Sequence, residues 1–222
     1  MKILPQSQRL HLTTIVCAVL LPLSSAFSAP SVEDKGNFGP PQVTFSEVPS
    51  FTPLNGLTIN GLTFSENVPI SFTAPAGFGP GNTNNISGAM ALSGLGSIPA
   101  GYVLSVSLAN QALSFGFGFA LQGLTTSVAN AVTLTLFSGA TNLGSLSFAG
   151  NADPNFTGGF AGIGNNVFFD RVQITFNQNA TGFAVDNFVA RDRVPENGGT
   201  LLMLLAGAAP LGVLARLRRR AV

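Results

Sequence analysis

Strict alternation of large and small residues between positions 113 and 121 is the feature that most constrains the fold. Leucine and phenylalanine occupy the odd positions of Leu113–Leu121, while serine, glycine and alanine occupy the even ones. Successive side chains of a β-strand point to opposite faces, so this pattern predicts a strand with one packed face. The same period recurs over Val132–Leu136 and Val172–Phe176. The chain is therefore expected to be built from half-buried antiparallel strands.

Six further segments favour strands, and turn-forming residues separate them. The additional strands are expected at Val43–Glu47, Leu57–Phe64, Val68–Thr73, Tyr102–Leu108, Leu143–Phe148 and Gly182–Ala190. Turns are expected at Asn55-Gly56, Asn60-Gly61, Gly79-Pro80-Gly81-Asn82, Ser138-Gly139 and Gly158-Gly159. Asn60-Gly61 also fits a bulge within one continuous strand. About nine short strands with glycine-rich turns predict an all-β fold, an antiparallel β-sandwich that is jelly-roll-like.

The first 29 residues have the layout of a secretory signal peptide. Lys2 and Arg9 form a basic start, Leu12–Leu23 is mostly apolar, and small residues follow up to Ala29. The apolar run has roughly 12 residues, short of the ~20 that span a bilayer, which disfavours a membrane anchor. Cleavage is expected after Ala26 or after Ala29. The chain is therefore expected to be exported.

The C-terminus combines a short polar stretch, an apolar segment and a basic end. Residues 198–215 carry no charge over 18 residues, a length at the low end of the transmembrane range. The basic end contains Arg216, Arg218, Arg219 and Arg220. Arginines beside a span stay in the cytoplasm, which agrees with an exported N-terminus. We expect a single transmembrane helix here; a buried core helix is the alternative, but it would leave the arginines unexplained.

This tail resembles the PEP-CTERM group of bacterial sorting signals, especially its VPDSG-type relatives. The matching signature is Val194, Pro195, Glu196, Asn197, Gly198, Gly199 and Thr200, with asparagine where proline or serine is usual. The resemblance implies an exosortase-type membrane transpeptidase as partner and cleavage near the signature. It also implies anchoring in the inner membrane first and delivery to the cell surface or extracellular matrix afterwards. The chain then divides into a signal peptide (1–29), a β-sandwich ectodomain (30–193) and a sorting tail (194–222).

The body also resembles the β-sandwich ectodomains that precede such tails. The first similar segment pairs Val43-Thr44-Phe45-Ser46-Glu47 with Gly61-Leu62-Thr63-Phe64. A central hairpin over 134–148 and closing segments over 159–163, 169–174 and 183–188 complete the likeness. Each piece is short, so the resemblance implies the fold more than a function.

Composition excludes several classes of chemistry from the exported part. The one cysteine, Cys17, and the one histidine, His11, both lie in the predicted signal peptide. Thiol nucleophiles, thiolate metal sites and histidine acid–base catalysis are therefore not expected. Between residues 30 and 196 nine acids oppose four cations, a net charge of −5. This charge disfavours nucleic-acid binding.

Two groups of residues could form sites. Phe115, Phe117 and Phe119 could be a sugar-stacking platform, but platforms usually expose Trp or Tyr, so we expect these rings in the core. Glu47 and Asp186 lie near the two ends of the domain sequence. First and last strands often pair in a jelly roll, so these carboxylates could together hold a structural Ca²⁺ ion. The alternative is that both are ordinary strand-end acids.

A glycosidase needs two suitably spaced carboxylates, which Asp153, Asp170 and Asp186 could in principle supply. No aromatic sugar cleft accompanies them in the sequence, so catalysis is not expected. The sequence thus predicts a non-enzymatic, structural or adhesive surface protein that could contact extracellular polysaccharide. A glycan-binding module is the alternative.

Overall fold

The computed structural model describes residues 29–77, 85–94, 96–153 and 156–192, and this part of the chain is almost entirely antiparallel β-sheet. The strands are β1 (Ser31–Val32), β2 (Thr58–Ile59), β3 (Leu62–Glu66), β4 (Ser71–Ala74), β5 (Met90–Ser93), β6 (Leu104–Gln122), β7 (Val128–Ser138), β8 (Thr141–Ala152), β9 (Phe156–Phe176) and β10 (Gly182–Arg191). A single 3₁₀ turn, η1 (Lys35–Asn37), lies between β1 and β2. The all-β prediction is confirmed. Within the described ranges no helix has the length and apolarity needed to cross a bilayer; the predicted signal peptide and sorting tail lie almost entirely outside them.

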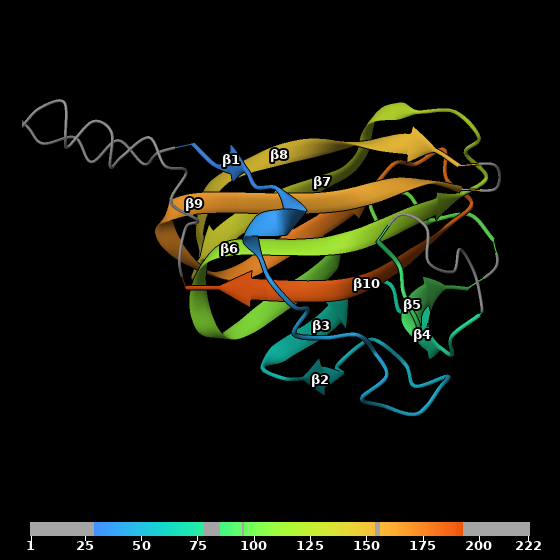
Figure 1. The fold of residues 1–222 in the computed structure, drawn as a ribbon, viewed down its shortest axis with the longest axis horizontal. Coiled ribbons are helices and arrows are strands. Elements are labelled where there is room, and N and C mark those ends of the chain that lie inside the picture. Colours follow the sequence, from blue (N-terminus) through green and yellow to red (C-terminus); the bar gives the residue numbers. More distant parts are fainter. Residues whose placement is uncertain (1–28, 78–84, 95, 154–155, 193–222) are drawn as a thin grey trace, which may run out of the picture.

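Two long strands, β6 and β9, connect the layers of the sandwich-like fold. The main sheet order is β4-β5-β10-β6-β9-β7-β8. The first part of β6, Leu104–Ser107, pairs with the end of β9 and with β3. Its second part, Ser114–Gln122, pairs with the start of β9 and with β10. The register shifts between Ser107 and Ser114, and both strands turn back at the left of Figure 1.

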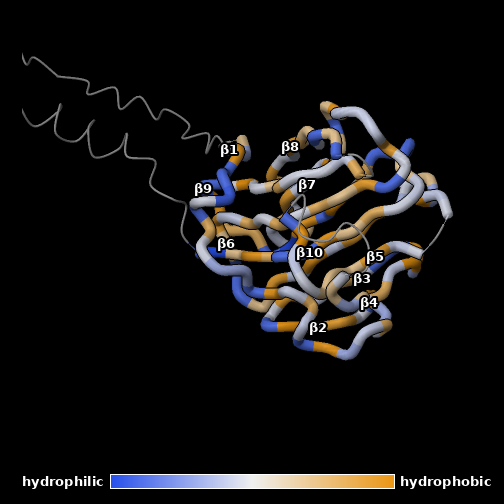
Figure 2. Tube along the Cα trace, turned by 45° about the vertical axis from the view of Figure 1, so that its right-hand side comes forward, coloured by the Kyte–Doolittle hydropathy of each residue, from blue (hydrophilic) through white to orange (hydrophobic). Residues whose placement is uncertain are grey.

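The interior contains the phenylalanines that the alternation placed there. Phe115, Phe117 and Phe119 are fully buried in one large core cluster. The ring of Phe117 stacks on that of Phe188 from β10, with centroids 4.9 Å apart. Figure 2 shows hydrophobic residues following the strands and hydrophilic residues gathering at turns and strand ends. The core interpretation of the phenylalanine stripe is confirmed.

Several predicted turns and strands are also confirmed. Asn60-Gly61 is the two-residue turn between β2 and β3, with φ of 46° and 83°. Positive φ at both central positions is the geometry that Asn-Gly favours, so the bulge alternative is wrong. Ser138-Gly139 lies at the turn from β7 to β8. The predicted strands at 132–136, 143–148 and 182–190 lie within β7, β8 and β10.

Other expectations are wrong. Val43–Glu47 makes only one bridge, from Val43 to Phe188, and then turns sharply with Phe45 at a φ of 57°. The segments 102–108 and 113–121 belong mostly to one strand, β6, and Gly158-Gly159 lies inside β9 rather than at a turn. Four strands exceed ten residues, so they are not uniformly short. Strand β5 was missed because its run has only four residues. The first half of β9 was indicated only by the family resemblance over 159–163, because its glycines give no regular alternation of size.

Candidate functional site

The bridge between Val43 and Phe188 brings the start of the domain to the last strand. Asp186, fully buried in β10, accepts hydrogen bonds from the backbone N–H groups of Ser87 (2.8 Å) and Asn187 (2.6 Å). Burial raises the pKa of the Asp186 carboxyl from 3.8 to about 7; the two hydrogen bonds oppose this shift, and the charge of Glu47 adds to it. The structure thus brings the predicted pair, Glu47 and Asp186, within electrostatic range.

These two carboxylates fit only part of a calcium site. The exposed Glu47 carboxylate accepts hydrogen bonds from the backbone N–H and the hydroxyl of Thr44. Each carboxylate keeps further lone pairs, but Ca²⁺ requires about six to eight oxygen ligands. Within the described parts of the chain no group of three acidic, histidine or cysteine side chains could hold a metal. Backbone carbonyls and water would have to complete the set.

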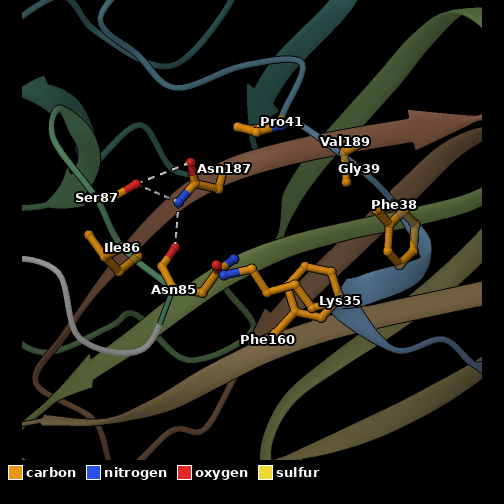
Figure 3. Close-up of a pocket in the computed structure, with 10 residues that line it drawn as sticks. All are labelled: Lys35, Phe38, Gly39, Pro41, Asn85, Ile86, Ser87, Phe160, Asn187 and Val189. Atoms are coloured by element: carbon orange, nitrogen blue, oxygen red, sulfur yellow. Dashed lines mark hydrogen bonds between the residues drawn. The ribbon is translucent and has the colours of Figure 1, made fainter.

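A bulge in β10 next to Asp186 positions a neighbouring loop segment. The register of β10 on β6 shifts between Asp186 and Val189, and Asn187 there has a φ of 56°. The Asn187 side-chain amide donates hydrogen bonds to the Asn85 carbonyl (2.6 Å) and to Ser87 Oγ (3.0 Å). Figure 3 shows these bonds along one side of a cavity. Residues 85–87, which we call the amide segment, are therefore held against β10 by Asp186 and Asn187.

Glycines on the outer face of β6 allow that close approach. A Cβ atom on Gly118 would lie 2.7 Å from the carbonyl carbon of Asn85, so the amide segment packs directly on the strand backbone. A Cβ on Gly116 would lie 2.5 Å from Cζ of Phe160. Pairing of β6 with β9 places Phe160 opposite Gly118 and Gly162 opposite Gly116. The face opposite the phenylalanine core is thus a glycine floor on which Phe160 lies.

A second covering segment, residues 33–41, crosses the same face; we call it the N-terminal strap. A Cβ on Gly162 would lie 3.0 Å from the Phe38 ring. Phe38 packs edge-on against Phe160, with ring centroids 5.4 Å apart. Arg191 fixes the strap by donating hydrogen bonds to the carbonyls of Phe38 (2.9 Å) and Pro40 (2.8 Å). The strap and the amide segment therefore stand on either side of Phe160.

Between these two segments lies a partly open cavity of about 260 Å³, which we call the strap cavity. Ten residues from the strap, the amide segment, β9 and β10 line it: Lys35, Phe38, Gly39, Pro41, Asn85, Ile86, Ser87, Phe160, Asn187 and Val189. Figure 3 shows the Lys35 side chain running past Phe160 toward Asn85. An apolar floor with a few polar groups at its edge is the usual make-up of a small-molecule site.

A further cavity of about 310 Å³, lined in part by Arg191, has a different character. Its lining includes Gln42, Asn60, Asn110, Gln111 and Arg191, and no aromatic ring. Gln42 and Asn60 already exchange hydrogen bonds through each other's backbone carbonyls. This second cavity offers hydrogen bonds but no stacking surface.

The three acids considered for a glycosidase lie in different parts of the fold. Asp170 accepts a hydrogen bond from the backbone N–H of Gly139 (2.9 Å) at the turn between β7 and β8. Asp153 lies in the connection between β8 and β9, and Asp186 is buried at the β10 bulge. Neither Asp153 nor Asp170 contributes to the raised pKa of Asp186. The arrangement gives no support to an acid pair made from these residues.

Sequence reasoning did not find the residues of the strap cavity. Gly116 and Gly118 were noticed only as small residues of an alternating strand, and Phe160 only as part of a family-like segment. Two pairs were available as signals, because Gly116-x-Gly118 and Gly162-x-Gly164 both leave one strand face bare. Their juxtaposition depends on the register of β6 with β9, which the sequence does not display.

Comparisons with known proteins give little further information. No protein-family model matches the chain, and no curated protein matches it. Among solved structures, the enzymatically active domain of tailspike protein 4 of bacteriophage CBA120 matches with a TM-score of 0.35 and 14% identity. The match covers 62% of this chain but only 21% of the tailspike chain. At that level of similarity it carries no argument about fold or activity.

Proposed function

We propose that the chain is an exported, non-enzymatic β-sandwich that an exosortase-type transpeptidase sorts to the cell surface or matrix. The observation that carries this proposal is the tail, in which signature, apolar segment and arginine cluster follow one another. The geometry of the domain is compatible with it. The described chain begins and ends at the same end of the sandwich, on the left of Figure 1. A leader and an anchor attached there would leave the opposite end free for contacts.

Replacement of Pro195-Glu196 by two alanines tests this proposal. The altered chain should keep its full length and remain in the membrane fraction, whereas the unaltered chain is shortened and delivered to the surface or matrix. The same replacement at Asn110-Gln111, both exposed on β6, is the matched control and should be processed normally. Normal shortening and release of the Pro195-Glu196 variant would contradict the proposal.

A glycan-binding module is the second candidate for the body of the protein. The strap cavity favours it, because an aromatic floor beside amide and hydroxyl groups suits a sugar ring. A structural Ca²⁺ ion held partly by Glu47 and Asp186 and a jelly-roll topology belong to the same proposal. Binding on a glycan array that a chelator abolishes would support this candidate. Retention in the matrix without any sugar binding would favour the structural role, and turnover of a polysaccharide would overturn both.

A further inference from the structure

The floor of the strap cavity is an aromatic ring kept accessible by glycines. Phe160 is partly exposed on the outer face, unlike Phe115 and Phe117 on the buried face of β6. Gly116 and Gly162 leave room for the Phe160 ring to lie over the sheet, since a Cβ at either position would come within 2.7 Å of it. The Phe38 ring packs against the Phe160 ring in an edge-to-face contact and holds it in place. The face of an aromatic ring carries partial negative charge, so it attracts the polarised C–H groups of a sugar ring.

The amide segment supplies hydrogen-bonding groups at the edge of this ring. Both amide protons of Asn187 are already used, for the Asn85 carbonyl and Ser87 Oγ. Among the residues that the structure describes, Asn187 Oδ1 accepts only a long 3.4 Å bond from Ser87 and keeps lone pairs for a ligand hydroxyl. The Ser87 hydroxyl is exposed beside it. These groups are held rigidly by β10, so little ordering is needed when a ligand binds.

The charged side chain that lines the cavity favours an acidic ligand over a neutral one. Of the described residues that line it, Lys35 alone carries a charge. Asp186 lies behind the amide segment, where its carboxyl accepts the backbone N–H groups of Ser87 and Asn187, and Asp34 is exposed next to Lys35. Arg191 stands behind the strap and bonds to its carbonyls. A carboxylate that approaches along the Phe160 ring would therefore meet an ammonium group first.

We propose that the strap cavity binds one uronic-acid unit of an extracellular polysaccharide. The sugar ring stacks on Phe160, its hydroxyls contact Asn187 and Ser87, and its carboxylate pairs with Lys35. The volume of about 260 Å³ is below the ~300–1,000 Å³ of sites for larger ligands, which suits a single sugar unit. The inference rests on the glycan-binding function proposed above and specifies its site and ligand class.

Titration of the full-length protein in detergent with glucuronate and with glucose, followed by saturation-transfer NMR, tests this assignment. Glucuronate should bind more tightly than glucose. Lys35→Gln should weaken glucuronate binding about two- to five-fold, as expected for one exposed ion pair, and leave glucose unchanged. Phe160→Ala should abolish binding of both sugars, while Phe160→Tyr keeps the ring and the binding. Gln111→Ala in the second cavity is the matched control and should bind normally.

The results of these titrations distinguish a failure of the strap cavity assignment from a failure of the proposed glycan-binding function. If polysaccharide binding survives both Lys35→Gln and Phe160→Ala, the glycan-binding function stands and the strap cavity assignment is wrong. If the unaltered protein binds no glycan at all, both fail. Lys35 is exposed, so its variant remains folded even if the loss of the Phe160 ring unfolds the domain. Equal affinity for glucose and glucuronate would overturn the choice of an acidic sugar.

Discussion

Substitution of Gly118 by alanine tests whether the glycine floor sets the position of the amide segment. The added methyl group would lie 2.7 Å from the carbonyl carbon of Asn85 and 2.9 Å from its Cβ, so the segment has to move. Overpacking of this kind costs about 1–3 kcal/mol. Moving the segment also weakens the Ser87 N–H bond to Asp186, and a hydrogen bond to an uncharged carboxyl contributes about 0.5–1.5 kcal/mol.

A gain in strand stability opposes these losses. Glycine inside a strand is about 0.5–1 kcal/mol less favourable than alanine. The net effect of Gly118→Ala should therefore be a loss of about 0.5–4 kcal/mol in the free energy of unfolding. For a domain of about 165 residues, each kcal/mol lowers Tm by about 2–4 °C.

Gly159→Ala is the matched control for this substitution. Gly159 lies on β9 opposite Phe119, and a Cβ there would meet nothing nearer than the Ala149 carbonyl oxygen at 4.0 Å. This variant should gain a few tenths of a kcal/mol, up to about 1. Urea unfolding of the full-length protein in detergent, followed by far-UV circular dichroism, compares the two. Equal stability of the Gly118 and Gly159 variants would refute the close packing of the amide segment on β6.

Two further predictions concern Asp186 and the core. Because the pKa of Asp186 is about 7 in the folded protein, above its ordinary value of 3.8, the folded state holds a proton that the unfolded state releases between these pH values. The contribution of Asp186 to stability should therefore be greatest below pH 4 and should fall by up to about 1.4 kcal/mol per pH unit until pH 7. Asp186→Asn should remove this slope in urea titrations at several pH values. An unchanged slope would contradict the raised pKa of Asp186. Phe117→Ala should lower the free energy of unfolding by about 3–5 kcal/mol, because it removes a fully buried ring stacked on Phe188, and a loss below 1 kcal/mol in the same assay would exclude a tightly packed core here.

Patterns among neighbouring residues predicted the core-facing residues of β6 and the turn between β2 and β3. Alternation placed Phe117 in the core, and Asn60-Gly61 predicted a turn, because both depend on neighbouring residues alone. The strap cavity depends on long-range register, which brings Phe160 of β9 across from Gly118 of β6. Glycines give no signal of what covers them. The sequence therefore placed Gly118 at a small position of an alternating strand but could not identify the segment that fills the space above it.

The predicted Glu47–Asp186 pair and the strap cavity are physically connected, which affects how a calcium experiment is interpreted. Asp186 accepts a hydrogen bond from the Ser87 N–H, and the adjacent Asn187 donates one to the Asn85 carbonyl. Both ends of the amide segment are therefore attached to the β10 bulge. Removing a cation from Asp186 would alter one cavity wall even if the cation never touched a sugar. Loss of sugar binding in a chelator would then reflect an indirect effect. Gly118→Ala displaces the same wall without involving any metal, so it should weaken sugar binding in the presence of Ca²⁺ as well. If that variant binds normally while the chelator abolishes binding, the cation contacts the sugar directly.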